Sequence, residues 1–360
     1  MKKLKYSLIP VLALFFIAIV TGATPATLKN KNENLDWLQN WFSAWELISK
    51  ELFFLPADPA PLMLFFDKEY VYTTSAISAP VADIINGPSL LGEKLIWRKA
   101  VHNGQLTLPD GQKIPVGLMT FAAPLKDANR KSFFVMAAPP YWKEAGVESP
   151  ELGIENLLTG VFLHEFAHTH QMQGIGARVD EIDSTHKFNM ALSDDIVQDH
   201  YKKDSVYVRL FRAETNKFYE AVFAHSEKGA RILASKALSL LKKRQATYFK
   251  GEKVILVELD NIFLSMEGLG QYTAVAWLTH PEGADMPFEK AVNGFRRKGS
   301  QWSQEEGLAL FLILNRLTKT DWPNDIFGKR PKHVIELLEK GFRKKIQKPQ
   351  ANNKKCSPKN

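Results

Sequence analysis

The chain of 360 residues is 45% hydrophobic and 24% charged, a composition that excludes a disordered or fibrous protein and fits two domains or one large domain with an extension. Its one cysteine, Cys356, excludes an intrachain disulfide framework and a cysteine-cluster metal site. The formal net charge of +8 comes from the two ends of the chain. Residues 1–23 contain three basic residues and residues 341–360 contain seven, and neither segment contains an acidic residue, whereas residues 24–340 have a net charge of −2. A nucleic-acid partner is therefore not expected.

The first segment has the order of a secretory signal peptide. Lysines precede an apolar run of 13 residues, Leu8–Val20, and small residues follow it, with cleavage expected after Ala23 or Ala26. The run is short for a membrane span, which needs roughly 20 residues, and an uncleaved anchor is the alternative. We expect a signal peptide at 1–23 and an exported protein, secreted or periplasmic, with no stable membrane span after cleavage.

Residues 24–140 are expected to form an N-terminal α+β part with a twisted sheet. Large apolar residues recur at helical spacing from Leu35 to Phe54, which predicts an amphipathic helix. Short β-rich runs follow, separated by the turn signals Asn103-Gly104 and Asp110-Gly111, which favour hairpins. The four runs are Leu62–Thr74, Lys94–His102, Ile114–Ala123 and Ser132–Ala138.

Residues 141–346 are expected to form a helical part, and residues 347–360 a basic, disordered tail. Gly174 and Gly176 are predicted to end the first helix. The predicted helices span roughly 153–173, 193–203, 205–227, 229–249, 254–279, 303–319 and 332–346. Strands followed by helices indicate an α+β fold, with an antiparallel sheet ahead of the helices.

The first of these helices carries the motif H-E-x-x-H, in His164-Glu165-Phe166-Ala167-His168. Four residues turn an α-helix by about 400° and advance it by roughly 6 Å, so His164 and His168 share one face and can bind one metal ion. Glu165 flanks that site and can take a proton from water instead of binding the metal. The neighbouring residues are mostly apolar, and burying these three polar groups among them would be costly without a metal or a partner.

A catalytic zinc site needs a third protein ligand. The extended motif with a third histidine is absent, because Gln171 and Gly174 stand at its glycine and histidine positions. His170 points well away from the face that His164 and His168 share, since each residue turns the helix by about 100°. A glutamate is therefore the expected ligand.

Two glutamates are candidates for this ligand. Glu267 lies in a predicted helix and is followed by Gly268 and Gly270, which leave space for a neighbouring helix. Glu214 is the alternative, since it is the next glutamate after Glu181 and carries the carboxylate that the site needs.

His164-Glu165-Phe166-Ala167-His168, taken together with Glu267-Gly268-Leu269-Gly270-Gln271-Tyr272, resembles the gluzincin metallopeptidases, and among these the peptidase-MA-like branch. The resemblance covers about a third of the chain and does not include residues 24–130. Two departures are an insertion of 98 residues between the motifs and the presence of Gly270 and Gln271 where alanine and an acidic residue are common.

The resemblance implies a zincin-like fold and a zinc-dependent peptidase with one Zn²⁺ per chain, held by His164, His168 and Glu267. Zinc would polarise the scissile carbonyl of a peptide or protein substrate, and Glu165 would act as general base and later protonate the leaving amine. Several side chains are candidates for stabilising the developing oxyanion, namely Tyr272, Tyr201, Tyr207, His200 and Arg296.

Two other functions remain open from the sequence: a non-catalytic secreted or envelope binding protein on a zincin scaffold, and a non-peptidase zinc hydrolase. The presence of Glu165 speaks against the first, because a purely structural zinc site has no use for a base.

Three further segments are expected to serve the fold and not the site. Arg296-Arg297-Lys298 is interpreted as a loop charge cluster and Leu308–Leu314 as a buried helix. Four aspartates are interpreted as part of a solvated connector and not as a calcium site, because no EF-hand spacing is present: Asp180, Asp183, Asp194 and Asp195.

Overall fold

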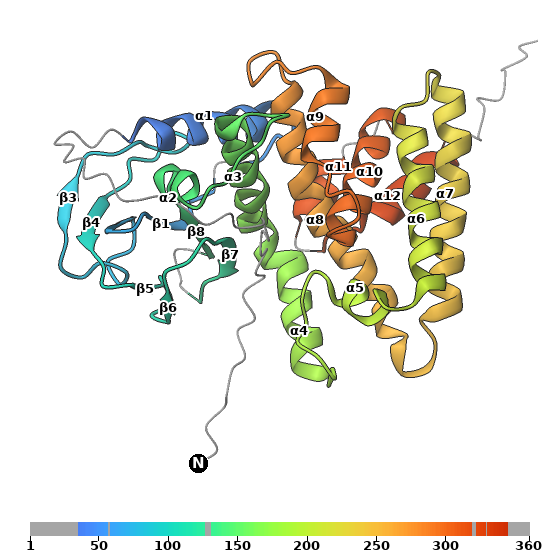
Figure 1. Ribbon diagram of the computed structural model, residues 1–360, viewed down its shortest axis with the longest axis horizontal. Coiled ribbons are helices and arrows are strands. Elements are labelled where there is room, and N and C mark those ends of the chain that lie inside the picture. The colour runs from blue at the N-terminus through green and yellow to red at the C-terminus, as the bar shows by residue number, and fades with distance from the viewer. Residues whose placement is uncertain (1–34, 57, 127–130, 319–321, 329, 345–360) are drawn as a thin grey trace, which may run out of the picture.

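The structure, a computed structural model, describes residues 35–56, 58–126, 131–318, 322–328 and 330–344. The expected signal peptide at 1–23, the basic tail at 347–360 and Cys356 lie outside these residues. A sheet-bearing part precedes a helical part along the chain, and helix α3 (Ile154–Gln171) lies between them (Figure 1). The fold is therefore α+β, in the order that the sequence predicts.

The main sheet has six strands in the order β3-β4-β2-β1-β8-β7. Strands β1 and β8 pair in parallel, with Leu62 opposite Phe133, whereas the other neighbours pair antiparallel. The predicted antiparallel pairing is therefore confirmed for four of the five strand pairs and wrong for β1 with β8. The bounds are β1 Leu62–Phe66, β2 Tyr70–Thr73, β3 Asp83–Ile85, β4 Trp97–Val101, β7 Thr120–Pro124 and β8 Ser132–Ala137.

Two of the predicted β-rich runs each contain a turn that the apolar pattern hides. The run 62–74 is a hairpin of β1 and β2, because the carboxylate of Asp67 accepts hydrogen bonds from the backbone of Glu69 and Tyr70 and reverses the chain. The run 114–123 is divided between β6 (Lys113–Pro115) and β7, which belong to different sheets.

The two turn signals have different outcomes. Asp110-Gly111 joins β5 (Gln105–Thr107) to β6 in a separate two-stranded sheet, so this hairpin is confirmed. Asn103-Gly104 connects β4 to β5, which do not pair with each other, so the second predicted hairpin is wrong. Gly104 still adopts a left-handed φ of 88°, the conformation that a glycine turn needs.

The predicted helices are present, with ends that differ by a few residues. Helices α2, α4, α9 and α11 were not predicted. Helix α3 continues through a π-helical turn (Met172–Gly176) into α4, so Gly174 and Gly176 do not end the helical path. The bounds are α1 Asp36–Glu51, α2 Pro139–Glu144, α4 Ala177–Thr185, α5 Ile196–Tyr201, α6 Ser205–Val222, α7 Glu227–Tyr248, α8 Ile255–Thr279, α9 Phe288–Phe295, α10 Trp302–Leu317, α11 Trp322–Phe327 and α12 Val334–Lys344.

Helix α3 is packed on two sides. Phe162 and Phe166 meet Phe134 of β8, with ring centroids 5.5 and 5.4 Å apart, and Phe162 also stacks on Trp41 of α1. The opposite side of α3 packs on α8, which in turn packs on α10. Residues two positions away from the phenylalanines point about 200° away on a helix, which directs His164 toward α8.

Candidate metal centre

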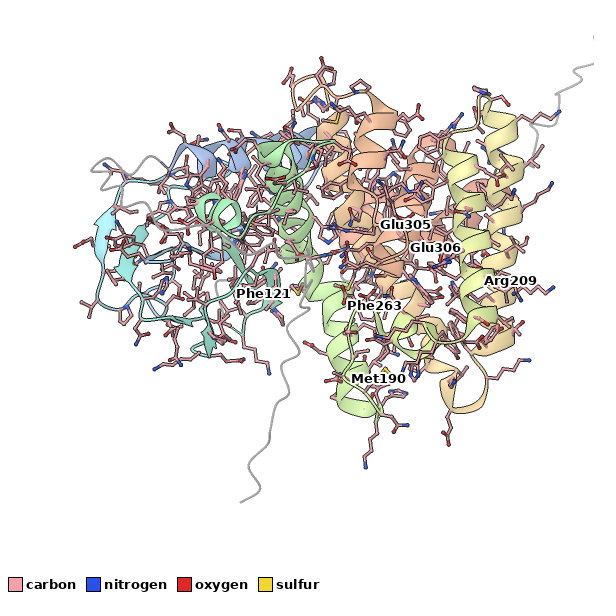
Figure 2. All side chains as sticks on the ribbon, viewed as in Figure 1. Phe121, Met190, Arg209, Phe263, Glu305 and Glu306 are labelled. Atoms are coloured by element: carbon pink, nitrogen blue, oxygen red, sulfur yellow. The ribbon has the colours of Figure 1, made fainter. Side chains whose placement is uncertain are left out.

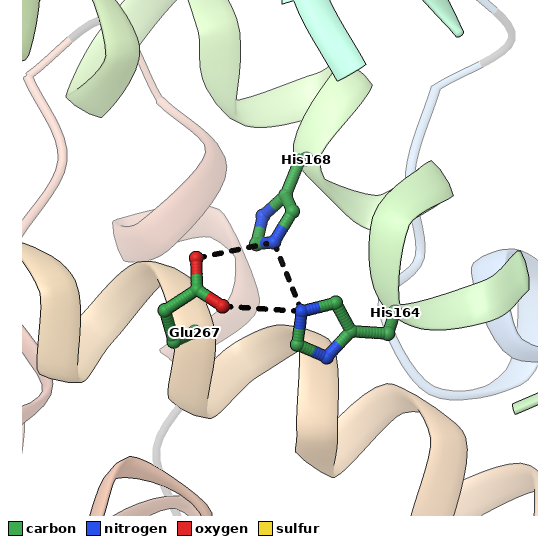
Figure 3. A group of neighbouring side chains, drawn as sticks. All are labelled: His164, His168 and Glu267. Atoms are coloured by element: carbon green, nitrogen blue, oxygen red, sulfur yellow. Dashed lines mark hydrogen bonds and ion pairs between the residues drawn. The ribbon is translucent and has the colours of Figure 1, made fainter. Parts of the chain in front are cut away.

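His164 and His168 of α3 meet Glu267 of α8 inside the protein, and each of the three side chains is at most 1% exposed. The Nε2 atoms of the two histidines are 3.2 Å apart. Glu267 places Oε2 3.2 Å from Nε2 of His164 and Oε1 3.5 Å from Nε2 of His168 (Figure 3). The three groups that the sequence proposed as ligands thus lie together, although 98 residues separate the two motifs.

The spacing of these donor atoms fits a metal ion. Two ligands bound at about 2.0–2.1 Å to one tetrahedral ion lie roughly 3.3 Å apart, which is close to the separations found here. The donor set of two imidazoles and a carboxylate suits first-row divalent metals. The group can therefore hold a metal ion.

Glycines on α8 make this approach possible. A Cβ atom on Gly270 would lie 2.7 Å from Nδ1 of His164, and one on Gly268 would lie 2.5 Å from the backbone of Gly307 in α10. Both distances are far shorter than an ordinary van der Waals contact, so each position requires glycine. The sequence predicts that these glycines leave space for a close neighbour, and this is confirmed. The side chain of His164 fills the space at Gly270, and helix α10 fills the space at Gly268.

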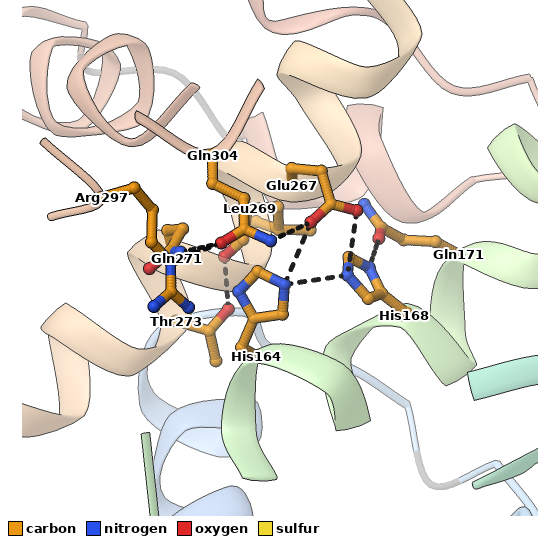
Figure 4. A network of polar contacts seen from close by, with 9 residues as sticks. All are labelled: His164, His168, Gln171, Glu267, Leu269, Gln271, Thr273, Arg297 and Gln304. Carbon is orange, nitrogen blue, oxygen red and sulfur yellow. Dashed lines mark hydrogen bonds and ion pairs between the residues drawn. The ribbon is translucent and has the colours of Figure 1, made fainter. Parts of the chain in front are cut away.

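Hydrogen bonds from other side chains orient two of the three ligands (Figure 4). Nδ1 of His168 lies 2.7 Å from Oε1 of Gln171, and because this oxygen can only accept a hydrogen bond, Nδ1 carries the proton. Nε2 of His168 is then unprotonated, and its lone pair is free to bind a metal. Nε2 of Gln304 donates to Oε2 of Glu267 at 3.0 Å. These contacts fix the directions in which His168 and Glu267 present their electron pairs.

The orientation of the Gln304 amide is itself determined by its neighbours. Nε of Arg297 and Nε2 of Gln271 both donate to Oε1 of Gln304, at 2.7 and 2.5 Å. Because a guanidinium can only donate, Gln304 must turn its oxygen toward Arg297 and its NH₂ group toward Glu267. A chain of contacts therefore runs from Arg297 through Gln304 to Glu267.

Glu165 differs from the other polar residues of the centre. It is 1% exposed, and within the described part of the chain neither of its carboxylate oxygens has a hydrogen-bond partner. Burial raises the pKa of Glu165 well above its ordinary value, and the charges of Glu267 and Asp194 raise it further. A bound cation would oppose these effects, because it favours a negative charge beside it.

The protonation of the ligands also suits a metal. Burial lowers the pKa of His164 to about 4, so its imidazole is neutral at neutral pH, which is the form that binds metals. Burial alone would raise the pKa of Glu267, but its interactions with His168 and His164 hold this pKa below the ordinary value. Glu267 is therefore an anion.

The alternative ligand Glu214 lies elsewhere. It forms an ion pair with Arg244, which also contacts Asp260 and Glu306 at 3.1 and 3.5 Å in a buried cluster of α6, α7, α8 and α10. The expectation that Glu214 could be the third ligand is therefore wrong, because the guanidinium of Arg244 already neutralises it.

Most of the candidate oxyanion donors have other contacts. The hydroxyl of Tyr207 accepts from Arg244, Tyr201 stacks on Tyr207, and Tyr272 stacks on Phe311. Arg296 pairs with Glu305, and His200 lies on α5 with its ring near that of Tyr201. In the described residues, no hydrogen bond or ion pair joins any of these five residues to His164, His168 or Glu267.

Two interpretations of polar clusters need correction. Arg297 is not a plain loop charge, because it reaches Gln304 at the centre and its Nη2 atom is buried; burial also lowers its pKa to about 10, so it stays charged at neutral pH. Asp194 is not solvated, since it is 7% exposed. Burial raises its pKa well above the ordinary value, and the charge of Glu267 raises it further. By contrast, the helix over Leu308–Leu314 is buried as predicted.

The sequence alone did not identify the orienting residues. Gln171 stands three positions after His168 on one helix, so its spacing was an available signal. Arg297 and Gln304 follow the second motif by 25 and 32 positions. Packing of α10 on α8 brings Gln304 to the centre, and Arg297 contacts Gln304.

The centre is closed in this structure. A small pocket lies beside it, lined by Met172 and Met266, which adjoin Gln171 and Glu267 in sequence, and by Asp194. Because the ligands and Glu165 are at most 1% exposed, a substrate can reach them only after neighbouring side chains move.

Comparisons with models of protein families, with curated proteins and with solved structures give no match for this chain. In the described ranges, no helix has both the length and the apolar content required to cross a membrane.

Proposed function

We propose that the protein is an exported zinc-dependent peptidase of the gluzincin type, with a zincin-like fold. The ligand set of two histidines and a glutamate is one that catalytic zinc uses, with a further coordination position left for water or substrate. When bound, zinc supplies a Lewis acid that polarises a carbonyl group and makes water acidic near neutral pH. His164, His168 and Glu267 would hold it.

The observation that carries the proposal is the carboxylate of Glu165. A buried carboxylate without a hydrogen-bond partner destabilises a fold, so a purely structural site would not favour one beside its ligands. A general base, in contrast, needs free lone pairs directed at the reacting water. Both oxygens of Glu165 are without a hydrogen-bond partner in the described residues, which supports this role.

The chain's own residues divide the remaining work. Glu165 accepts a proton on a carboxylate oxygen during attack on the peptide carbonyl and returns it to the leaving amine. Gln171 keeps the proton of His168 on Nδ1, and Gln304 holds the carboxylate of Glu267 in place. Exclusion of bulk water from the closed centre strengthens the electrostatic contribution of each group.

Metal analysis combined with a peptidase assay tests the proposal. Elemental analysis of the purified protein should find one zinc per chain in the wild type and none in His164→Ala. Glu165→Gln should retain zinc but lose hydrolysis of a fluorogenic peptide library by about 10²–10⁴-fold, the usual contribution of a general base. Glu155→Gln, an exposed change on the same helix, is the matched control and should alter neither measurement.

Each other outcome has a definite meaning. A wild type without stoichiometric metal would overturn the proposal. Zinc with no hydrolysis of any substrate would favour a binding protein on a zincin scaffold. Zinc with Glu165-dependent hydrolysis of esters or other amides, but not of peptides, would favour a non-peptidase zinc hydrolase.

A further inference from the structure

The near-zero net charge of residues 24–340 conceals a strong separation of charge. Residues 202–250 contain twelve basic and four acidic residues, a net charge of +8, so the rest of 24–340 carries −10. Residues 202–250 include α6 and α7, which pack on each other as a hairpin. Basic character is thus concentrated on one structural unit.

This hairpin forms the outermost layer of the helical part, on the far side of the molecule from the main sheet (Figure 1). Arg209 projects from α6 to the outside (Figure 2). Within the described part of the chain, seven exposed basic side chains of this unit have no ion-pair partner: Lys203, Arg209, Arg212, Lys228, Lys236, Lys243 and Lys250. We call them the basic face.

Large apolar side chains are exposed among these basic residues. Val206 and Leu210 on α6 are 45% and 40% exposed, and Ile232 and Leu240 on α7 are 49% and 39% exposed. On α6, Val206 stands three positions before Arg209 and Leu210 one position after it, so apolar and basic side chains share the outer side of this helix. Along α6 a shallow groove includes Lys203, Arg209 and Arg212 in its lining.

We propose that the basic face docks on a membrane surface that contains anionic lipids. Basic side chains are attracted to anionic headgroups, and apolar side chains beside them enter the boundary between headgroups and acyl chains. A nucleic acid would use the same charges but would have no use for exposed aliphatic side chains, and it favours aromatic residues for stacking. The observations therefore favour lipid, and the inference does not depend on the metal centre.

Vesicle cosedimentation of the full-length protein tests this inference. The wild type should bind phosphatidylcholine vesicles that contain about one third phosphatidylglycerol, but not pure phosphatidylcholine, and high salt should release it. The triple variant Lys203→Glu, Arg209→Glu and Arg212→Glu should bind about 100-fold more weakly, since each basic residue near an anionic surface contributes roughly fivefold.

A matched control changes the net charge equally at other places. The triple variant Lys94→Glu, Lys113→Glu and Lys290→Glu alters exposed lysines outside the hairpin and should bind within about fivefold of the wild type, which is roughly the contribution of one basic residue. The double variant Val206→Ser and Leu210→Ser keeps every charge and should weaken binding several-fold, because the apolar anchors are lost. Circular dichroism melting confirms that each variant is folded.

Three results would overturn the inference. The first is wild-type protein that does not bind the anionic vesicles at low salt. The second is equal loss of binding in the two triple variants, which would make net charge, and not this face, responsible. The third is binding to duplex DNA that is tighter than binding to vesicles and is lost in the basic-face variant, which would assign the face to a nucleic acid.

Discussion

Replacing Gly270 with alanine would place a methyl group against the imidazole of His164. The new Cβ would lie 2.7 Å from Nδ1 and 2.8 Å from Cγ and Cε1 of the ring, whereas ordinary contacts begin near 3.4 Å. Because α8 is packed between α3 and α10, the ring has to move, by about 0.7 Å. Metal–ligand distances tolerate only about 0.2 Å, so Nε2 of His164 would leave its place beside Glu267.

The expected loss is larger for metal affinity than for stability. Small displacements of this kind weaken metal binding by about 10–100-fold or more. Overpacking costs about 1–3 kcal/mol, but alanine is favoured over glycine in a helix by about 1 kcal/mol, so the metal-free protein should lose no more than about 2 kcal/mol of unfolding free energy.

Zinc affinity measured against a chromophoric chelator, together with urea unfolding in EDTA, gives both quantities. Gly268→Ala is the control, because its Cβ would meet the backbone of Gly307 at 2.5 Å and should destabilise the metal-free protein more than Gly270→Ala does. If Gly270→Ala binds zinc as tightly as the wild type, the reasoning about the ring of His164 is refuted.

Three further predictions concern buried polar groups. Gln304→Leu removes the hydrogen bond to Glu267 and should weaken zinc binding by about 10–100-fold, measured with the same chelator. Burial, with the charge of Glu214, raises the pKa of Glu306, so the folded protein keeps a proton on Glu306 that the unfolded chain releases above pH 4.5. The free energy of unfolding, measured with urea, should therefore fall as the pH rises from 5 to 8. Glu306→Gln should make this fall smaller. Arg244→Met leaves the carboxylates of its cluster without a counter-charge and should lower the unfolding free energy at pH 8 by about 3–5 kcal/mol; a change below about 1 kcal/mol would contradict this account.

The grouping of the three candidate ligands was predictable because their signals are local. Two histidines four residues apart must share a helical face, and a glutamate followed by Gly268 and Gly270 indicates a helix that meets another group closely. The partners of these ligands were not predictable in the same way. Gln304 and Arg297 have no characteristic spacing. Gln304 reaches Glu267 because α10 crosses α8 at Gly268 and Gly307, and Arg297 contacts Gln304.

The fold shows the same division between local and distant signals. The long helix α8 was predicted to within one residue, since its apolar residues extend over many turns. The parallel pairing of β1 with β8 joins segments about 70 residues apart, and no pattern within either strand specifies its neighbour. The charge of the α6–α7 hairpin was missed because a sum over residues 24–340 averages it with the acidic remainder.

The chain of contacts from Arg297 to Glu267 has a consequence for the timing of assembly. During synthesis the residues of α3 emerge first, and their two histidines are joined by Glu267 only about 100 residues later. Its carboxylate is not held until Gln304 has been made and α10 has packed on α8. A complete, oriented chelating group therefore exists only after α10 has been made and packed. Under the export that we propose, a chain that folds after export would take up a metal at its destination.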